Sequence, residues 1–343
     1  MAIYLNAEQV ALSQRLILGA NRIVITSHKS PDGDAVGSAL GLYHVLKSMK
    51  EDVTVVLPDS VPDYLHWISA FDKIIFFDSN RSNAQESIEK ADLIFVLDYN
   101  IFSRTGEEMS KVLESASANF ILIDHHQQPG DFAKVTYSDT SACSTCEMTY
   151  RFVRSCEWLN AINTEAAEAI YCGIMTDSGS FRFPSVTAET HQIVADLIAN
   201  GLDHAKIHRA VYDTNLLERL RLVGYSLSEK LEVWPEAATA IISLTKEELE
   251  RFHHRPGDTE GLVNQALSIK GVKVAVFARE GHNEIKLSFR SKGNFDVNTF
   301  ARNGWNGGGH RNAAGGSSND GMTETIARLK KSIMEVKEEI IHS

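Results

Sequence analysis

The first half of the chain alternates between short apolar runs and longer amphipathic stretches. Apolar runs occupy residues 22–28, 52–58, 72–78, 91–99 and 120–126, and helix-like spacing of apolar residues separates most of them. Each run is continuous rather than alternating in polarity, which is typical of strands that are buried on both faces of a parallel sheet. The pattern therefore predicts an α/β domain in which helices cover both faces of a parallel sheet.

The second half of the chain shows a different pattern. Strand-like runs at 238–244, 272–280 and 284–291 precede a glycine-rich segment, 303–316, and the chain closes with a helix-like stretch. These features predict a second, smaller α/β domain. The length of 343 residues, 43% of them hydrophobic, also favours two domains over one.

We place the boundary between the domains within a helical connecting segment. The N-terminal parallel-sheet domain is expected to span residues 1–205, the connecting segment 206–236, and the C-terminal α/β domain 237–343. The placement follows the helix-like spacing that precedes the second set of strand-like runs.

Charge and hydropathy exclude several classes of protein. A formal net charge of −11 argues against broad, salt-dependent binding of long duplex nucleic acid, which requires a basic surface. The longest apolar runs are short, such as residues 93–97, so we expect no membrane-spanning segment. The N-terminal stretch has neither a basic start nor a small-residue cleavage site, and we therefore expect a cytoplasmic protein.

The chain contains four cysteines, Cys143, Cys146, Cys156 and Cys172. We expect reduced thiols rather than a disulfide framework, because the core is large and no secretion signal is apparent. Two of them form a C-x-x-C pair, but no second pair has the spacing of a zinc site. A structural role is the simplest interpretation of this pair, and a redox or zinc-binding role is the alternative.

Aspartates and histidines stand where apolar segments of the first half end. A single aspartate there is usually a helix cap or a turn residue, and Asp32 and Asp34 in the Pro-Asp-Gly-Asp turn could each be explained in this way. Four segments that we interpret as strand ends nevertheless share the feature, and in a parallel sheet the carboxyl ends of the strands open into one crevice. The residues are His28, Asp32, Asp34, Asp98, Asp124, His125, His126 and Asp177.

Several carboxylates in one crevice would repel one another unless a cation lay between them. Carboxylates mixed with imidazoles, without thiolates, suit Mn²⁺, Mg²⁺ or Fe²⁺ better than structural zinc. The number of candidate ligands exceeds what one ion needs, so we expect two ions, an arrangement that promotes attack on phosphorus. The residues alone thus favour a metal-dependent hydrolase of phosphoesters or phosphoanhydrides.

The order of four motifs resembles the DHH phosphoesterase superfamily. The motifs are "TSHKSPDGDAVGS", "VLDY", "IDHH" and "GIMTDSGSFRF". The later stretch "FRSKGNFDVNTFARNGWNGGGHRNAAGG" is similar to the DHH-associated substrate domain. Within the superfamily the chain most resembles the NrnA-type subgroup of oligoribonucleases and 3′-phosphoadenosine 5′-phosphate phosphatases. The C-terminal stretch separates this subgroup from the pyrophosphatase and exopolyphosphatase branches.

The resemblance assigns a role to each residue of the crevice. It implies that His28, Asp32 and Asp98 bind a first Mn²⁺, and that a second is bound by Asp34, His125 and Asp177, with Asp98 as the bridge. His126 resembles the histidine that faces the substrate phosphate and helps to protonate the leaving oxygen. Asp124 would orient one of the imidazoles, and an Asx turn is the equally weighted alternative.

The resemblance also implies contacts between the C-terminal domain and the substrate. Arg290 and His310 would bind a phosphate, and the backbone N–H groups of Gly307, Gly308 and Gly309 would approach it closely. Asn306 departs from the family pattern, which often has a further glycine at this position.

Three further residues have alternative interpretations. Arg182 would contact a phosphate or pair with a nearby acid. Phe295 and Trp305 would stack on bases or, as we consider simpler, pack in the core.

The resemblance implies a two-metal enzyme that uses Mn²⁺, with Mg²⁺ as the alternative. Its substrates would be short single-stranded RNA or DNA oligonucleotides, cleaved to nucleoside monophosphates, or 3′-phosphoadenosine 5′-phosphate, converted to AMP and phosphate. Linear or cyclic dinucleotides, pyrophosphate and polyphosphate are alternative substrates, and a non-catalytic nucleotide sensor is a remote alternative. A homodimer is compatible with this interpretation.

Overall fold

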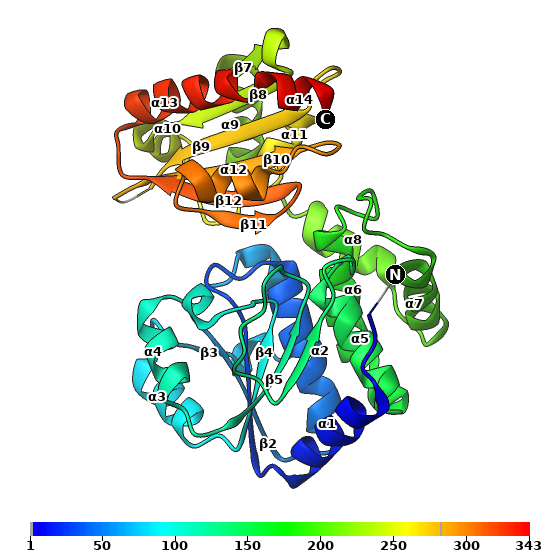
Figure 1. The fold of residues 1–343 in the computed structure, drawn as a ribbon. Helices are drawn as coiled ribbons and strands as arrows, with labels where there is room; N and C mark the ends of the chain where they lie inside the picture. The colour runs from blue at the N-terminus through cyan, green and yellow to red at the C-terminus, as the bar shows by residue number, and fades with distance from the viewer. Residues whose placement is uncertain (1–2, 282) are drawn as a thin grey trace. The chain divides into compact units, whose positions relative to one another are not determined.

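The computed structural model describes residues 3–281 and 283–343. The chain divides into two compact units, Met1–Thr214 and Asn215–Ser343. In Figure 1 the first unit runs from blue to green and the second from yellow-green to red. The division falls inside the segment 206–236 in which the sequence places the connection between the domains.

A six-stranded parallel sheet forms the centre of the first unit, with the strand order β3-β2-β1-β4-β5-β6. Neighbouring strands pair in parallel throughout, for example Ile23 with Val53 on one side and with Leu93 on the other. The predicted parallel sheet is therefore confirmed. The strands are β1 (Arg22–Thr26), β2 (Asp52–Leu57), β3 (Ile75–Phe76), β4 (Leu93–Leu97), β5 (Asn119–Asp124) and β6 (Val135–Ser138).

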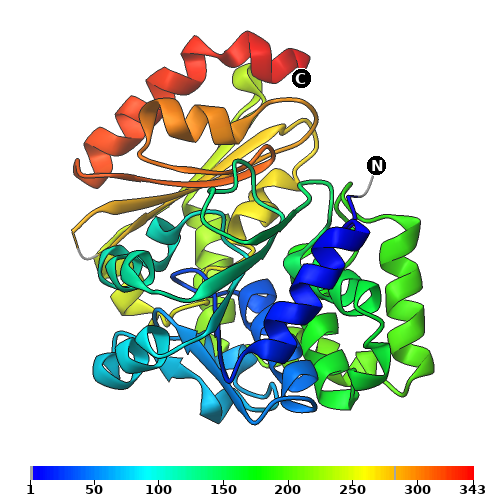
Figure 2. The same cartoon turned by 60° about the horizontal axis from the view of Figure 1, so that its bottom comes forward.

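Helices cover both faces of this sheet, as Figures 1 and 2 show. Successive side chains of a strand point to opposite faces. Ile23 and Ile25 accordingly pack into the large core beneath α2, α5 and α6, whereas Val24 packs into the core beneath α3 and α4. The helices are α1 (Ala7–Gly19), α2 (Gly33–Lys47), α3 (Arg81–Glu89), α4 (Glu107–Ser115), α5 (Thr145–Ser155), α6 (Thr164–Asp177), α7 (Ala188–Ala199) and α8 (His204–Tyr212).

Two strands differ from the sequence-based expectation. The apolar run 72–78 forms only the short strand Ile75–Phe76, because a 3₁₀ turn at Phe71–Lys73 occupies its first part. The sixth strand, Val135–Ser138, was not predicted. Its four residues alternate between buried and half-buried positions, which is too short a pattern to stand out from a loop.

Helices α2 and α6 approach each other closely because glycine lies at their contact. A Cβ atom on Gly37 would lie 2.5 Å from the carbonyl oxygen of Ala169 and 3.0 Å from Sγ of Cys146. The first neighbour is backbone, so it cannot swing aside. This contact fixes α2, whose first turn carries Asp34.

We expect Gly37→Ala to destabilise the first unit by about 1–3 kcal/mol, the usual cost of overpacking a core. Differential scanning calorimetry would show a lower Tm. Gly19→Ala is the matched control, since nothing lies within 4 Å of a Cβ at the end of α1. An unchanged Tm for Gly37→Ala would contradict the close helix contact.

The second unit is built around a mixed six-stranded sheet with the order β11-β12-β10-β9-β8-β7. Among the described residues of this sheet only β8 and β9 pair in parallel, and the other neighbouring strands are antiparallel. The predicted smaller α/β C-terminal region is confirmed. The strands are β7 (Leu231–Trp234), β8 (Thr239–Leu244), β9 (Val274–Glu280), β10 (Ile285–Ser291), β11 (Gly308–His310) and β12 (Ala313–Ser318).

This second sheet also has a hydrophobic core on each face. One core receives Leu222, Leu249 and Leu262 from α9, α10 and α11. The other receives Ala301, Leu329 and Ile340 from α12, α13 and α14. The helices are α9 (Leu217–Glu229), α10 (Lys246–Arg251), α11 (Leu262–Leu267), α12 (Val297–Gly304), α13 (Met322–Glu335) and α14 (Lys337–His342).

Phe295 and Trp305 pack in the core beneath α12 and α13, with 7% and 1% of their surface exposed. The core-packing interpretation therefore describes both residues. Among the described residues, no helix is long and apolar enough to cross a membrane.

Candidate metal centre

The candidate site begins where the strand order of the first sheet reverses. From β1 the sheet grows through β2 to one edge, and from β4 it grows through β5 to the other. In open sheets of this order, ligands bind at the carboxyl ends of the two strands that flank the reversal. His28 lies just beyond β1 and Asp98 directly follows β4, and His28 Nε2 is 3.3 Å from Asp98 Oδ2. The pair spans the reversal point.

The predicted ligands form two groups at this edge. His28, Asp32 and Asp98 each offer a ligand atom within 4.8 Å of the other two. The same holds for a second group, formed by Asp34, His125 and Asp177. These are the two sets of three residues that the family resemblance assigns to two ions.

Asp98 connects the two groups. Its Oδ2 atom faces His28, whereas its Oδ1 atom lies 3.4 Å from His125 Nε2. The residue is 2% exposed, and its backbone adopts a left-handed conformation with φ of 63°. Aspartate tolerates this region better than most residues, but the conformation still costs about 1–3 kcal/mol. The turn immediately after β4 thus directs one carboxylate toward both groups.

The backbone fixes the orientation of two imidazoles. His28 Nδ1 lies 2.9 Å from the carbonyl oxygen of Lys29, and His125 Nδ1 lies 3.3 Å from that of Ala142. A carbonyl only accepts hydrogen bonds, so Nδ1 carries the proton in each ring. In both rings Nε2 then faces carboxylates, which is the usual arrangement of a metal-binding histidine.

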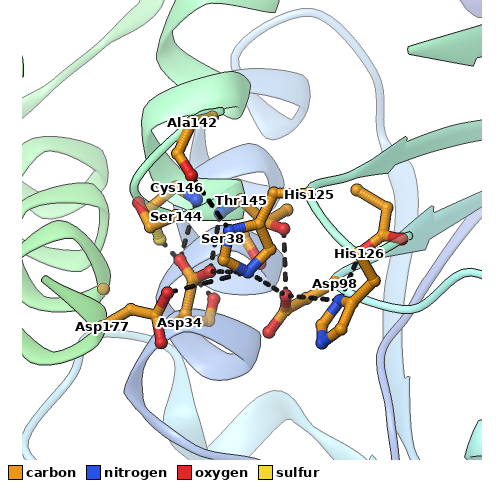
Figure 3. Close-up of polar contacts among 12 residues, drawn as sticks. Asp34, Ser38, Asp98, His125, His126, Ala142, Ser144, Thr145, Cys146 and Asp177 are labelled. Carbon is orange, nitrogen blue, oxygen red and sulfur yellow. Dashed lines mark hydrogen bonds and ion pairs between the residues drawn. The ribbon is translucent and has the colours of Figure 1, made fainter. Parts of the chain in front are cut away.

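Asp34 is held by the N-terminus of α5 (Figure 3). Its two carboxylate oxygens accept hydrogen bonds from the backbone N–H groups of Thr145, at 2.6 Å, and Cys146, at 2.8 Å. These N–H groups lie in the first turn, where the helix dipole favours negative charge. Burial nevertheless raises the pKa of Asp34 well above its usual value, and the charges of Asp98 and Asp177 add to the effect.

Asp177 is the last residue of α6, so the expectation that it follows a strand was wrong. A carboxylate at the C-terminus of a helix meets the negative end of the helix dipole. Its Oδ2 atom lies 3.6 Å from His125 Nε2. Partial burial, together with Asp32 and Asp98, raises the pKa of Asp177 to about 6 although His125 opposes the shift. A nearby cation would relieve this repulsion.

Asp124 and His126 form a hydrogen-bonded pair beside the second group. His126 Nδ1 lies 2.7 Å from Asp124 Oδ1 and 3.7 Å from Asp98 Oδ1. Asp124 is fully buried, and its Oδ2 atom has no hydrogen-bond partner in the part of the chain that the structure describes. This contact favours the orienting role of Asp124 over an Asx turn.

The charges of the centre call for a cation. Burial lowers the pKa of His28, but hydrogen bonding to Asp98 and the charges of Asp32 and Asp98 outweigh it and raise the pKa to about 9. Burial would raise the pKa of Asp98, yet the hydrogen bonds from His125 and His28 hold it well below its usual value. The raised pKa values mean that the protonated imidazoles of His28 and His125 balance the carboxylate charges here. Hard carboxylate oxygens with neutral imidazoles would fit divalent ions in the same role.

Several contacts of the centre were not predicted from the sequence. Thr145 Oγ1 donates to Asp98 Oδ1 at 3.0 Å, and the carbonyl of Ala142 accepts from His125. A threonine after a serine at a helix start looks like ordinary capping, so the sequence carries little signal for this role. The four cysteines are buried, and burial raises the pKa of Cys146, which disfavours a thiolate ligand.

The predicted substrate contacts of the second unit lie on β10 and β11, the two strands that flank β12. Arg290 on β10 and His310 on β11 both pair with Ala313 of β12. Directly paired residues share a face of the sheet, so both side chains emerge on the same face. Arg182 belongs to the first unit, where its Nε donates to the carbonyl of Gly179 at 2.7 Å and braces the turn after Asp177.

The glycine-rich segment is a β-hairpin rather than an open loop. Gly308, Gly309 and His310 form β11, which pairs with β12. The N–H group of Gly309 already donates to Asn298 Oδ1 at 2.9 Å. Asn306 adopts a left-handed conformation with φ of 46°, which asparagine tolerates almost as glycine does. Asparagine therefore suits the backbone conformation that this position adopts.

A parallel sheet with this switch point and a carboxylate–imidazole centre defines a metal-dependent hydrolase of the α/β class. Comparison with known proteins agrees. Residues 22–174 match the DHH family, N-terminal domain, and residues 239–339 match the DHHA1 domain. The chain belongs to the DHH family, whose members are metal-dependent phosphoesterases.

Individual relatives cover most of the chain. It is 30% identical over 301 residues to the bifunctional oligoribonuclease and PAP phosphatase NrnA of Bacillus subtilis, covering 86% of this chain and 88% of the relative. It is 29% identical to the protein of the same name from Thermus thermophilus, covering 85% and 83%. An exopolyphosphatase-related protein of Bacteroides fragilis has a crystal structure that superposes with a TM-score of 0.93 at 39% identity, covering 98% of both chains.

Ion binding to the centre should release protons. An ion must displace the proton of His28 at any pH below about 9. We therefore expect the affinity for Mn²⁺ to rise as the pH increases from 6.5 toward 9, the interval between the ordinary and the raised pKa. Isothermal titration calorimetry in buffers of different ionisation enthalpy measures the number of protons released.

His66→Gln serves as the control, because this histidine binds the carbonyl of Val61 away from the centre. Its proton release should equal that of the wild type. An Mn²⁺ affinity that stays constant across this pH interval would contradict the protonated state of the imidazoles.

Proposed function

We propose that this phosphoesterase holds two Mn²⁺ ions and hydrolyses short oligonucleotides to nucleoside monophosphates, 3′-phosphoadenosine 5′-phosphate to AMP and phosphate, or both. The first unit would hold the ions, with Mg²⁺ as the alternative metal. The second unit would bind the rest of the nucleotide. Cys143, Cys146 and Cys156 are free thiols, which suits a reducing compartment and supports our expectation of a cytoplasmic enzyme.

The position of Asp98 carries the proposal. Each of its oxygens faces a different group of candidate ligands, and each group contains both carboxylate and imidazole. One ion would be held by His28, Asp32 and Asp98. The other would be held by Asp34, His125 and Asp177, again with Asp98. When bound, the ions would supply Lewis acidity that activates a water and offsets charge on the phosphate oxygens.

His126 would deliver the proton that the reaction requires. Attack of water on phosphorus forms one P–O bond and breaks another, and the departing oxygen needs a proton. Asp124 Oδ1 lies 2.7 Å from Nδ1 of His126, which orients the ring. Nε2 is then the atom that would donate to the leaving oxygen. The same carboxylate–imidazole pairing orients general acids and bases in other hydrolases.

The relatives named above support the choice of substrate. Two carry oligoribonuclease and PAP phosphatase in their names, and they match along most of both chains. Arg290 and His310 of the second unit would bind a phosphate, because a guanidinium offers a planar fork to phosphate oxygens. The protein's net charge of −11 is consistent with a small anionic substrate that is bound locally rather than along a basic surface.

A substrate panel tests this proposal. It contains short RNA, 3′-phosphoadenosine 5′-phosphate, linear dinucleotides and polyphosphate, each with Mn²⁺, with Mg²⁺ and with chelator. Polyphosphate is included because of the name of the Bacteroides fragilis relative. Release of nucleoside monophosphates or AMP with Mn²⁺ is expected. Hydrolysis of polyphosphate alone would overturn the substrate assignment, and nucleotide binding without turnover would favour a sensor.

Asp98→Ala should lower Mn²⁺-dependent hydrolysis by more than about 100-fold, because both groups lose a shared ligand. Product formation from the preferred substrate measures the effect. Asp92→Ala is the control, since this aspartate caps the other end of the sheet through the N–H groups of Asn21 and Arg22. Wild-type activity in Asp98→Ala would exclude the two-metal assignment.

His126→Gln should lower kcat by about 10²–10⁴-fold, the usual contribution of a general acid. Binding of Mn²⁺ should change little, because in our assignment His126 is not a ligand. A steady-state assay combined with calorimetric Mn²⁺ titration separates the two effects. If the variant instead lost the metal and kept its kcat at saturating Mn²⁺, His126 would be a ligand and not the acid.

A further inference from the structure

One segment of the first unit supplies no candidate metal ligand itself, but it contacts three candidate ligands, Asp34, Asp98 and His125. The segment, residues 142–146, joins the loop after β6 to the first turn of α5. The carbonyl of Ala142 accepts from His125, and the N–H groups of Thr145 and Cys146 donate to Asp34. Figure 3 shows Ala142, Thr145 and Cys146 beside Asp34, Asp98 and His125. The segment thus orients the centre from outside.

Thr145 is the residue of this segment whose side chain also takes part. Its Oγ1 donates to Asp98 Oδ1 at 3.0 Å, and its backbone N–H donates to Asp34 Oδ2 at 2.6 Å. One residue therefore contacts a candidate ligand of the second group and the carboxylate that connects both groups. Thr145 is fully buried, so water cannot readily replace its hydroxyl.

The Thr145 hydroxyl restrains the rotation of the Asp98 carboxylate, which the backbone alone does not fix. The left-handed φ of Asp98 sets the direction of the side chain, but the terminal torsion of a carboxylate is broad. A donor at Oδ1 narrows this torsion and keeps Oδ2 facing His28. Threonine is suited to the task because its branched Cβ restricts χ1.

The position of Thr145 is itself rigid. Ser144 caps α5 by accepting from the N–H group of Glu147 at 3.0 Å. The buried carboxylate of Glu147 accepts from Cys143 Sγ at 2.8 Å and from Thr190 Oγ1 at 3.0 Å, and it pairs with the buried Arg151. A buried hydrogen-bonded network of this kind fixes the first turn of the helix.

We propose that Thr145 is a positioning residue of the metal centre. Its hydroxyl holds the carboxylate of Asp98 in the orientation that serves both groups of ligands, and this sets the affinity of the centre for divalent ions. The inference rests on the proposed two-metal function. Thr145 itself binds neither ion nor substrate, and it acts through Asp98.

The test compares three substitutions by their affinity for Mn²⁺, measured without substrate by calorimetry or by the EPR signal of free Mn²⁺. Thr145→Val removes the hydroxyl and keeps the shape, whereas Thr145→Ser keeps the hydroxyl. Thr149→Val is the matched control, because Thr149 lies one turn further along α5. It is equally buried, and its hydroxyl has no hydrogen-bond partner among the residues described.

We expect Thr145→Val to weaken Mn²⁺ binding by about 10–100-fold, the usual effect of removing an outer partner of a metal ligand. Thr145→Ser should bind within a few fold of the wild type, and Thr149→Val should match it. Thr145→Ala gives the same comparison if Thr145→Val does not fold, as judged by circular dichroism.

Wild-type affinity in folded Thr145→Val or Thr145→Ala would overturn the inference, as would equal weakening in Thr145→Ser or Thr149→Val. These failures differ from failure of the proposed function. If the wild type itself bound no Mn²⁺, the metal centre would be wrong. If the wild type bound Mn²⁺ and Thr145→Val bound it equally well, only the role of Thr145 would be wrong.

Discussion

The repulsion among buried carboxylates at one edge of the sheet governs the architecture of the first unit. Asp34 and Asp98 are 1% and 2% exposed, and Asp177 adds a third charge beside His125. Uncompensated charges are very costly in a protein interior, so a fold keeps such a cluster only where positive charge balances it. The pKa of Asp34 is raised by burial and by the neighbouring carboxylates, which shows that the negative charge is not fully balanced. Divalent ions are the natural complement of that imbalance.

The surrounding helices compensate the charges unequally. Asp34 lies in the first turn of α2 and also accepts two N–H groups from the first turn of α5, so two helix dipoles stabilise it. Asp177 stands at the opposite end of its own helix, where the dipole destabilises it. The helix ends therefore supply positive potential on the side of Asp34 and none on the side of Asp177. His125 lies between the two and interacts with both.

The sequence predicts those parts of the centre that follow from strand order. His28, Asp98 and His125 follow buried apolar runs, and parallel strands must end at a common edge. Asp177 was wrongly assigned to a strand end. The apolar run before it fits a buried strand and a buried helix equally well, so the run alone could not decide between them. The strand β11 was missed because glycine carries no polarity pattern, and its pairing with β12 depends on tertiary contacts. Thr145 was missed because its partner, Asp98, is remote in sequence.

The contrast between Asp98 and Asp32 shows where the fold enforces geometry. The Asp32 side chain is 48% exposed, and its Oδ1 atom also caps α2 by accepting from Asp34 and Ala35. Such a candidate ligand can adjust, because its side chain is partly exposed to solvent and also bonded to the start of α2. Asp98 is buried, has a left-handed backbone and receives a hydroxyl from α5. A carboxylate that faces two groups at once has one useful orientation, so rigidity is concentrated on the residue that the two groups share.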